Sequence, residues 1–163
     1  MEDTISANGN KNTPENRGTM YAHITLTVIR RAPLLAVPRL RRLAYQTLYA
    51  HRADAPGALW AYALQPCTVR LVVGPTGGNA PDAFVVQLKA HLAASLLRAI
   101  RRADDETLDA VLHYNPVWGG AIYRVWEAGY HYVPLWNAYR LSQAVYALRI
   151  LHAVGAEVWL EGS

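Results

Sequence analysis

Residues 58–73 read ALWAYALQPCTVRLVV, and this stretch decides the fold. Two apolar runs, 58–64 and 69–73, flank a short polar break at 65–67. Apolar runs of this length, separated by so short a break, are typical of two strands joined by a tight turn. The sequence therefore predicts a β-hairpin in the first half of the chain.

Helical and extended patterns alternate around this hairpin. Residues 21–29 alternate and are rich in β-branched side chains, which predicts a strand. Apolar residues recur at helical spacing in 39–52, 81–102 and 138–153, which predicts three helices. Shorter elements are expected at 104–109 (helix) and at 122–126, 130–133 and 157–160 (extended). The order β-α-β-β-α-β-α-β predicts an α/β (α+β) fold, a ferredoxin-like antiparallel sheet with helices packed on it, in a single domain.

Length and composition narrow the class of protein. The 163 residues fit one domain, with residues 1–19 as a disordered polar tail and 20–163 as the folded part. We expect no membrane span, because the longest apolar run is far short of the roughly 18 residues required. Cys67 is the single cysteine, so no internal disulfide can form, and a cytoplasmic location is expected.

The charge favours an acidic partner. The formal net charge is +4, and the tail contributes three acidic and two basic residues, so the folded part carries +5. Within the folded part Lys89 is the only lysine and every other cation is an arginine, a side chain suited to bidentate contacts with phosphate. Nucleic acid is the partner that a basic domain favours, although enrichment in Arg, Ala and Leu can also reflect genome composition.

Aromatic and imidazole side chains are abundant but follow no known site pattern. The six histidines lack zinc-site spacing and are interpreted as scattered surface or rim residues. The five tryptophans are interpreted as core or interface residues, with stacking on unpaired bases as the alternative.

Several short motifs occur in a recognisable order along the chain. The first strand contains Tyr21, His23, Ile24 and Thr25, and it is followed by Arg30, Arg31, Pro33 and Leu34. The hairpin segment 62–73 comes next, then Leu88–Lys89, then Trp126, Gly129 and Tyr130, and finally Tyr146 and Gly155. Together they resemble the single-tyrosine HUH transposases, a family that includes the REP-associated tyrosine transposases and related insertion-sequence transposases. The resemblance covers about residues 21–158.

The resemblance implies a chemistry and locates its residues. Family members cut and rejoin single-stranded DNA through a tyrosine that forms a 5′-phosphotyrosine, and Tyr146 aligns with that nucleophile. Their divalent metal, Mg or Mn, is held by a His-hydrophobe-His pair and by a polar residue four positions after the tyrosine. This chain has Thr68 and Arg70 at the histidine positions and Ile150 at the third. Threonine is a poor ligand, arginine has the wrong charge and isoleucine cannot ligate, so we expect no metal cofactor and impaired catalysis.

The leading hypothesis is a transposase-like protein that binds single-stranded or hairpin DNA and is related to DNA transposition. Its expected DNA contacts are Arg30, Arg31, Arg70 and Lys89, and the expected assembly is a homodimer that uses the hydrophobic edge of the hairpin. One alternative is an active enzyme with a rebuilt site, for which Gln143 is a candidate replacement ligand. The other is a non-enzymatic protein-interaction module or an inert mobile-element remnant.

Overall fold

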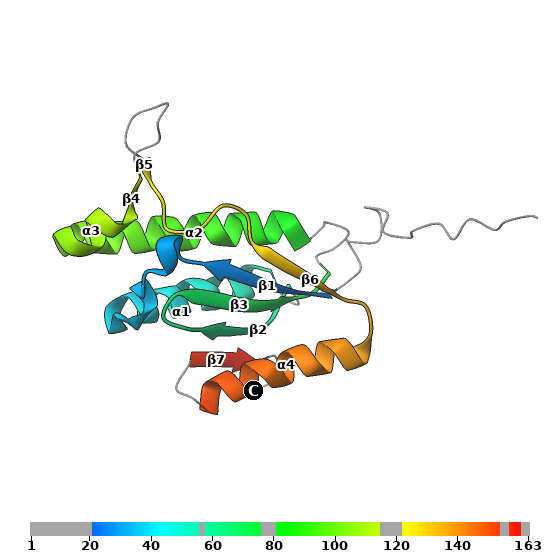
Figure 1. The fold of residues 1–163 in the computed structure, drawn as a ribbon. Coiled ribbons are helices and arrows are strands. Elements are labelled where there is room, and N and C mark those ends of the chain that lie inside the picture. The colour runs from blue at the N-terminus through cyan, green and yellow to red at the C-terminus, as the bar shows by residue number, and fades with distance from the viewer. Residues whose placement is uncertain (1–20, 56–57, 76–80, 115–121, 154–156, 161–163) are drawn as a thin grey trace, which may run out of the picture.

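A five-stranded antiparallel sheet forms the centre of the computed structural model, which describes residues 21–55, 58–75, 81–114, 122–153 and 157–160 (Figure 1). The strands follow the order β6-β1-β3-β2-β7, and each neighbouring pair is antiparallel. Their bounds are Tyr21–Thr27 (β1), Leu59–Leu64 (β2), Thr68–Val73 (β3), His131–Leu135 (β6) and Glu157–Leu160 (β7).

The predicted hairpin is confirmed as β2 and β3. Leu64 lies opposite Val69, and the backbone N–H of Gln65 donates to the carbonyl of Thr68 at 2.9 Å, which closes the turn. The order β6-β1-β3-β2 is the arrangement of a ferredoxin-like β-α-β-β-α-β unit, so the predicted fold class is also confirmed.

The expectation that the hairpin edge serves as a dimer interface is wrong. Strand β3 lies between β1 and β2, and β2 lies between β3 and β7. Both hairpin strands are therefore hydrogen-bonded on both sides and have no edge to offer a second chain.

Two long helices, α1 (Pro38–Asp54) and α2 (Pro81–Arg102), cover one face of the sheet (Figure 1). Pro38 occupies the first turn of α1, where its missing N–H costs no hydrogen bond. The predicted apolar stripe of α2 is buried in the main core and consists of Phe84, Leu88, Leu92, Leu96 and Ile100. By length and composition alone α2 is apolar enough to cross a membrane, but this stripe packs against the sheet and α1.

Helix α4 (Ala138–Ala153) covers part of the opposite face (Figure 1). The Asn137 side chain caps it, because its Oδ1 accepts from the N–H of Arg140 at 2.8 Å. Beneath α4 lies a second, smaller core, whose buried members are Ala61, Ala63, Val72, Leu135, Ala144 and Leu148. The domain thus has three layers, namely helices α1 and α2, the sheet, and helix α4. The small core beneath α4 occupies only part of its sheet face.

The remaining elements connect these layers. Helix α3 (Glu106–Leu112) starts two residues later than predicted, where the Asp105 carboxylate accepts from the N–H of Leu108. The predicted strand 21–29 ends at Thr27, before the 3-10 turns η2 (Ile29–Arg31) and η3 (Leu34–Ala36). The extended segment 122–126 includes β5 (Ile122–Tyr123), which pairs with β4 (His113–Tyr114). The tail 1–19 and Gly155 lie outside the described residues.

A histidine pair joins α1 to α2 and predicts an acid-sensitive stability. His91 Nδ1 lies 2.6 Å from His51 Nε2, with Asp54 and Arg98 beside the pair. Burial, and next the nearby His91, lower the pKa of His51 below 6.5, while Asp54 opposes them. As pH falls below about 6.5, the unfolded chain therefore takes up the proton before the folded one does. We expect the free energy of unfolding to decrease from pH 7.5 to pH 5.5.

Urea denaturation at the two pH values measures this change. The His91→Gln variant should show a smaller decrease than the wild type, because the paired imidazole is gone. Some decrease should remain, because burial also lowers the pKa of His23. An identical pH dependence in the wild type and His91→Gln would contradict the role of the pair.

Candidate nucleic-acid interface

Polar side chains from three strands form a row on the sheet face that α4 partly covers. Thr25 on β1 lies opposite Arg70 on β3 and, on its other side, opposite His131 on β6. Alternation along β1 places His23 on the same face as Thr25, one step along the strand. We call His23, Thr25, Arg70 and His131 the central cluster.

Two nitrogen atoms of the central cluster are buried without a partner. Neither His23 Nε2 nor Arg70 Nε makes a hydrogen bond within the described part of the chain. Burial, then Arg70, then His131 lower the pKa of His23, which keeps its imidazole neutral to lower pH. A buried polar atom without a partner costs about 1–3 kcal/mol, so this arrangement is maintained at the expense of stability. Buried polar atoms without a hydrogen-bond partner are typical of functional sites such as ligand-binding sites.

The three residues that the sequence resemblance aligns with metal ligands have side chains that do not fit a divalent cation. The Thr68 hydroxyl donates to Gln65 Oε1 at 2.9 Å and so belongs to the hairpin turn. Arg70 brings a positive charge to the centre of the face. Ile150 offers an aliphatic side chain that is 50% exposed. Among the described residues, no three His, Cys, Asp or Glu side chains are grouped to hold a metal.

A strained turn presents two arginines at the end of β1. Arg30 and Arg31 are exposed and have positive φ angles of 54° and 52°, a region that non-glycine residues rarely adopt. The backbone N–H of Arg30 donates to Glu127 Oε1 at 2.7 Å, and Ile29 N–H donates to the carbonyl of Val125 at 2.9 Å. These contacts hold the unusual backbone and leave the Arg30 and Arg31 side chains at the surface.

Lys89 has a structural role in addition to its expected DNA contact. Its ammonium donates to the carbonyls of Glu127 and Gly129 at 2.9 and 2.5 Å, and its own carbonyl accepts from Trp126 Nε1. Burial and Arg124 lower the pKa of Lys89. Two of the three ammonium donors are therefore occupied, and contact of Lys89 with DNA stays a prediction.

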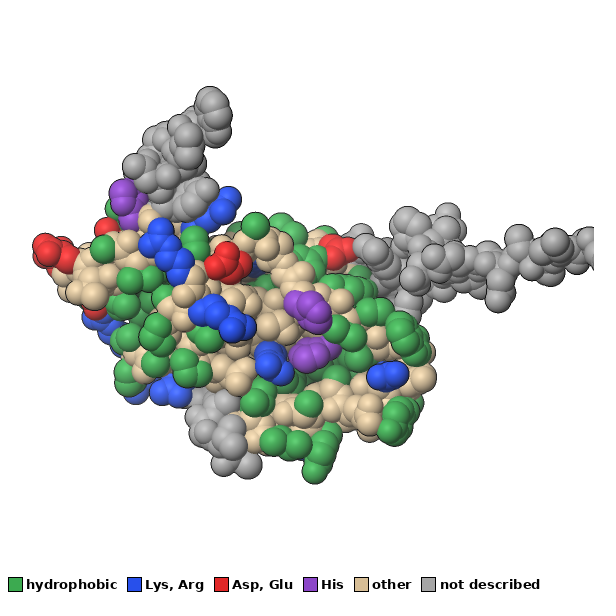
Figure 2. Space-filling view, viewed as in Figure 1, with side chains coloured by type: hydrophobic (Ala, Val, Ile, Leu, Met, Phe, Trp, Pro, Cys, Tyr) green, Lys and Arg blue, Asp and Glu red, His purple; other side chains and the backbone are tan. Residues whose placement is uncertain are grey.

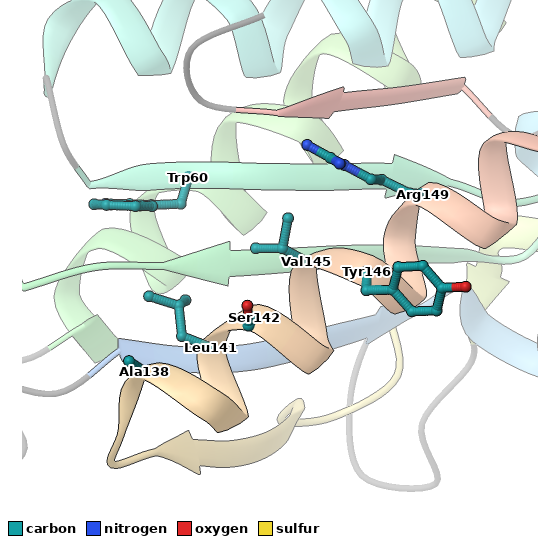
Figure 3. Close-up of a pocket in the computed structure, with 7 residues that line it drawn as sticks. All are labelled: Trp60, Ala138, Leu141, Ser142, Val145, Tyr146 and Arg149. Atoms are coloured by element: carbon teal, nitrogen blue, oxygen red, sulfur yellow. The ribbon is translucent and has the colours of Figure 1, made fainter.

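A groove separates α4 from the start of β2. A β-bulge between Leu59 and Ala61 turns both Trp60 and Ala61 toward the α4 layer. The groove has a volume of about 380 Å³. Its walls are formed by Trp60, Ala138, Leu141, Ser142, Val145, Tyr146 and Arg149. Figure 3 shows Trp60 at one end of the groove and Arg149 toward the other, with Ser142 and Val145 between them.

Tyr146 is exposed at the rim of this groove. Its side chain is 65% accessible, and Figure 3 shows its hydroxyl directed away from Trp60. Gln143, the candidate replacement ligand, donates instead to the hydroxyl of Tyr139 at 2.7 Å. The stripe of Tyr139, Gln143, Tyr146 and Ile150 faces solvent, so Tyr146 is accessible to a ligand, and the other members of this stripe include no histidine or carboxylate.

The elements that form most of this face carry arginines and no carboxylate. Strands β1, β2, β3 and β6 and helix α4 contain no aspartate or glutamate, whereas the arginines Arg70, Arg140 and Arg149 lie on them. Figure 2 shows histidine side chains next to Lys and Arg side chains near the middle of the visible surface. The acidic side chains in this view lie above them, where Figure 1 shows α2 and α3. An anion therefore meets attraction without a competing carboxylate from these elements.

The interpretation of the histidines as scattered is wrong for His51 and His91, which are in contact, and for His23 and His131. The second pair belongs to this surface. His23 and His131 are 108 positions apart in sequence, on β1 and β6, and meet beside Arg70. Alternation along β1 could have placed His23 on the face of Thr25, but the pairing of β1 with β6 is not readable from either segment alone. The tryptophan interpretation is confirmed for Trp126, which is 5% exposed. Trp136 is 61% exposed and so lies outside the core, and a role for it at an interface stays a prediction.

Comparison with known proteins adds a fold relationship. No family model and no curated protein sequence matches the chain. Among solved structures, the fold is similar to that of a REP-associated tyrosine transposase bound to a REP hairpin, with a TM-score of 0.56 and 11% sequence identity. The likeness covers 90% of this chain and 73% of the transposase chain. The protein therefore has a transposase-like fold.

Proposed function

We propose that this protein binds single-stranded or hairpin DNA through the surface formed by the central cluster and α4, without metal-dependent cleavage. The observation that carries the proposal is that Arg70 Nε and His23 Nε2 are both buried without a partner, on a sheet whose strands β1, β2, β3 and β6, like helix α4, carry no carboxylate. A phosphate oxygen is the acceptor that a guanidinium at this position favours, through a charge-assisted hydrogen bond. That a protein of similar fold binds a DNA hairpin supports DNA as the anion.

Fluorescence anisotropy tests the proposal directly. The purified protein is titrated with a labelled hairpin that carries a single-stranded flank, and with a duplex of equal length, across a salt series. We expect tighter binding to the hairpin and an affinity that falls as salt rises, because phosphate contacts release counterions. Equal, weak binding to both DNAs would contradict recognition of the single-stranded or hairpin form.

Metal ions should have no effect on either binding or cleavage. The residues at the metal-ligand positions cannot hold a divalent cation, so nothing there would activate the Tyr146 phenol or neutralise the phosphate. Incubation of the hairpin with the protein and Mg²⁺ or Mn²⁺ should yield no covalent adduct on denaturing gels. Tyr146→Phe is the matched control, because it removes one hydroxyl from an exposed side chain. A metal-dependent adduct that Tyr146→Phe abolishes would show an active enzyme with a rebuilt site.

A protein-interaction module is the second candidate function. It is favoured by the large side chains that α4 and the residue preceding its cap expose, namely Trp136, Tyr139, Tyr146 and Ile150. Exposed groups of this kind mark protein interfaces as well as nucleic-acid surfaces. Analytical ultracentrifugation separates the two: a stable oligomer without DNA affinity at moderate salt would favour this candidate. A homodimer that also binds DNA would fit the proposed function.

A further inference from the structure

The groove between α4 and β2 combines an aromatic wall, an aliphatic wall and a cation. The Tyr21 ring meets the Trp60 ring edge-on at 4.9 Å and 85°, which helps to hold the indole in place. Leu141 and Val145 line the α4 side, and the exposed Arg149 lies on the same helix. The volume of about 380 Å³ is within the usual range of small-ligand sites.

From this geometry we infer that the groove holds one unpaired nucleotide of the bound DNA, with its base against Trp60 and its phosphate at Arg149. The inference rests on the proposed function and names a second contact point for the same DNA strand. Aromatic side chains stack on the face of any base, and arginine adds a charged contact with the backbone. The Ser142 hydroxyl can donate to or accept from a base edge.

Charge decides in favour of a nucleotide over an apolar peptide. Helix α4 carries Arg140 and Arg149 and no carboxylate. The underlying strands β2 and β3 contribute Arg70 and no carboxylate either. A groove lined by the cation of Arg149 and by the indole of Trp60, on elements without a carboxylate, is complementary to a ligand that combines an anionic group with an aromatic ring. A single-stranded nucleotide has both properties.

The groove and the central cluster lie on neighbouring strands. Strand β3 carries Arg70 and is the immediate neighbour of β2, which carries Trp60. Helix α4 contacts both strands. A single strand that binds Arg70 through one phosphate can therefore place a nearby nucleotide in the groove without leaving this face of the sheet.

An abasic scan of the DNA tests the inference without depending on a protein variant. Each nucleotide of the single-stranded flank is replaced in turn by an abasic analogue, and the affinity for wild-type protein is measured. We expect one position to lose about tenfold in affinity, because the stacked base is missing. The same position, labelled with 2-aminopurine, should show fluorescence quenching when the protein binds.

Protein variants assign the effect to the groove. In Trp60→Leu the abasic position should no longer matter, whereas in Trp136→Leu it should matter as in the wild type. Trp136 is 61% exposed and lies outside the groove, so it matches the loss of one indole. Arg149→Gln, at an exposed position that should not affect folding, is expected to weaken binding of every flank variant.

The outcomes separate this inference from the proposed function. If no abasic position matters while the hairpin still binds and Arg70→Gln weakens it, the groove is not a base site and the proposed function stands. Persistence of the abasic effect in Trp60→Leu would also overturn the inference. Complete absence of hairpin binding at low salt would overturn both.

Discussion

Replacement of Arg70 by glutamine is expected to weaken hairpin binding by about 10- to 100-fold. A hydrogen bond to a charged group contributes about 1.5–3 kcal/mol, and each 1.4 kcal/mol is a tenfold change in affinity. Arg70 lies in the central strand β3 opposite Thr25, with its Nε buried and unpartnered. The amide of glutamine neither carries the charge nor forms the bidentate fork.

Fluorescence anisotropy with the flanked hairpin measures this loss, and Arg42→Gln is the matched control. Arg42 is exposed on α1, on the other side of the sheet, and its replacement removes the same formal charge. The slope of affinity against salt should fall by about one contact in Arg70→Gln only. Equal losses in the two variants would indicate a general charge effect and would contradict a specific role for Arg70.

The same variant should not unfold the domain. Arg70 is half-buried and its Nε has no partner, so the substitution removes a partly desolvated charge and breaks no intramolecular hydrogen bond at that atom. We therefore expect an unchanged or higher free energy of unfolding for Arg70→Gln. A site that gains stability when its function is lost is typical of residues retained for binding.

Truncation of Leu92 to alanine is expected to lower the free energy of unfolding by about 2–5 kcal/mol. Leu92 is fully buried on α2, within the main core between the helices and the sheet. The loss combines the missing apolar contacts with the cavity that remains. The substitution also tests whether α2 packs within the domain. If α2 were inserted in a membrane instead, Leu92→Ala would not create a cavity in the core and would not lower the free energy of unfolding by this amount.

Urea denaturation measures the change, with Val86→Ala as the control on the same helix. Val86 is 58% exposed, so its truncation removes little buried surface and should change stability by less than about 0.5 kcal/mol. A comparable effect of the two substitutions would contradict the packing of the α2 stripe against the sheet.

Local patterns were sufficient to predict most elements of the fold. The periods of α2 and α4 gave their bounds as the structure has them, and the capping role of Asn137 was readable from its place before α4. The hairpin was evident because a short polar break lies between two apolar runs. The end of β1 was placed two residues too late, since the turn at Arg30 and Arg31 depends on Glu127, far along the chain.

The candidate site was predictable only in part. Arg30, Arg31 and Arg70 were identified from the sequence, and the structure places Arg70 at the centre of the face and the other two at the end of β1. His23 and His131 were not connected with Arg70, because strand register is a long-range property. The groove at Trp60 was not foreseen either, since it needs a β-bulge and the position of α4.

The sequence by itself determined the order of the helices and strands, the hairpin and the positive charge of the domain, because these depend on neighbouring residues and on composition. Only the tertiary structure decided which side chains share a surface. Antiparallel pairing brought His23, Arg70 and His131 together from three separate strands, and the packing of α4 across β2 and β3 formed the groove beside them. Such contacts arise from register and layer packing, which no single segment encodes.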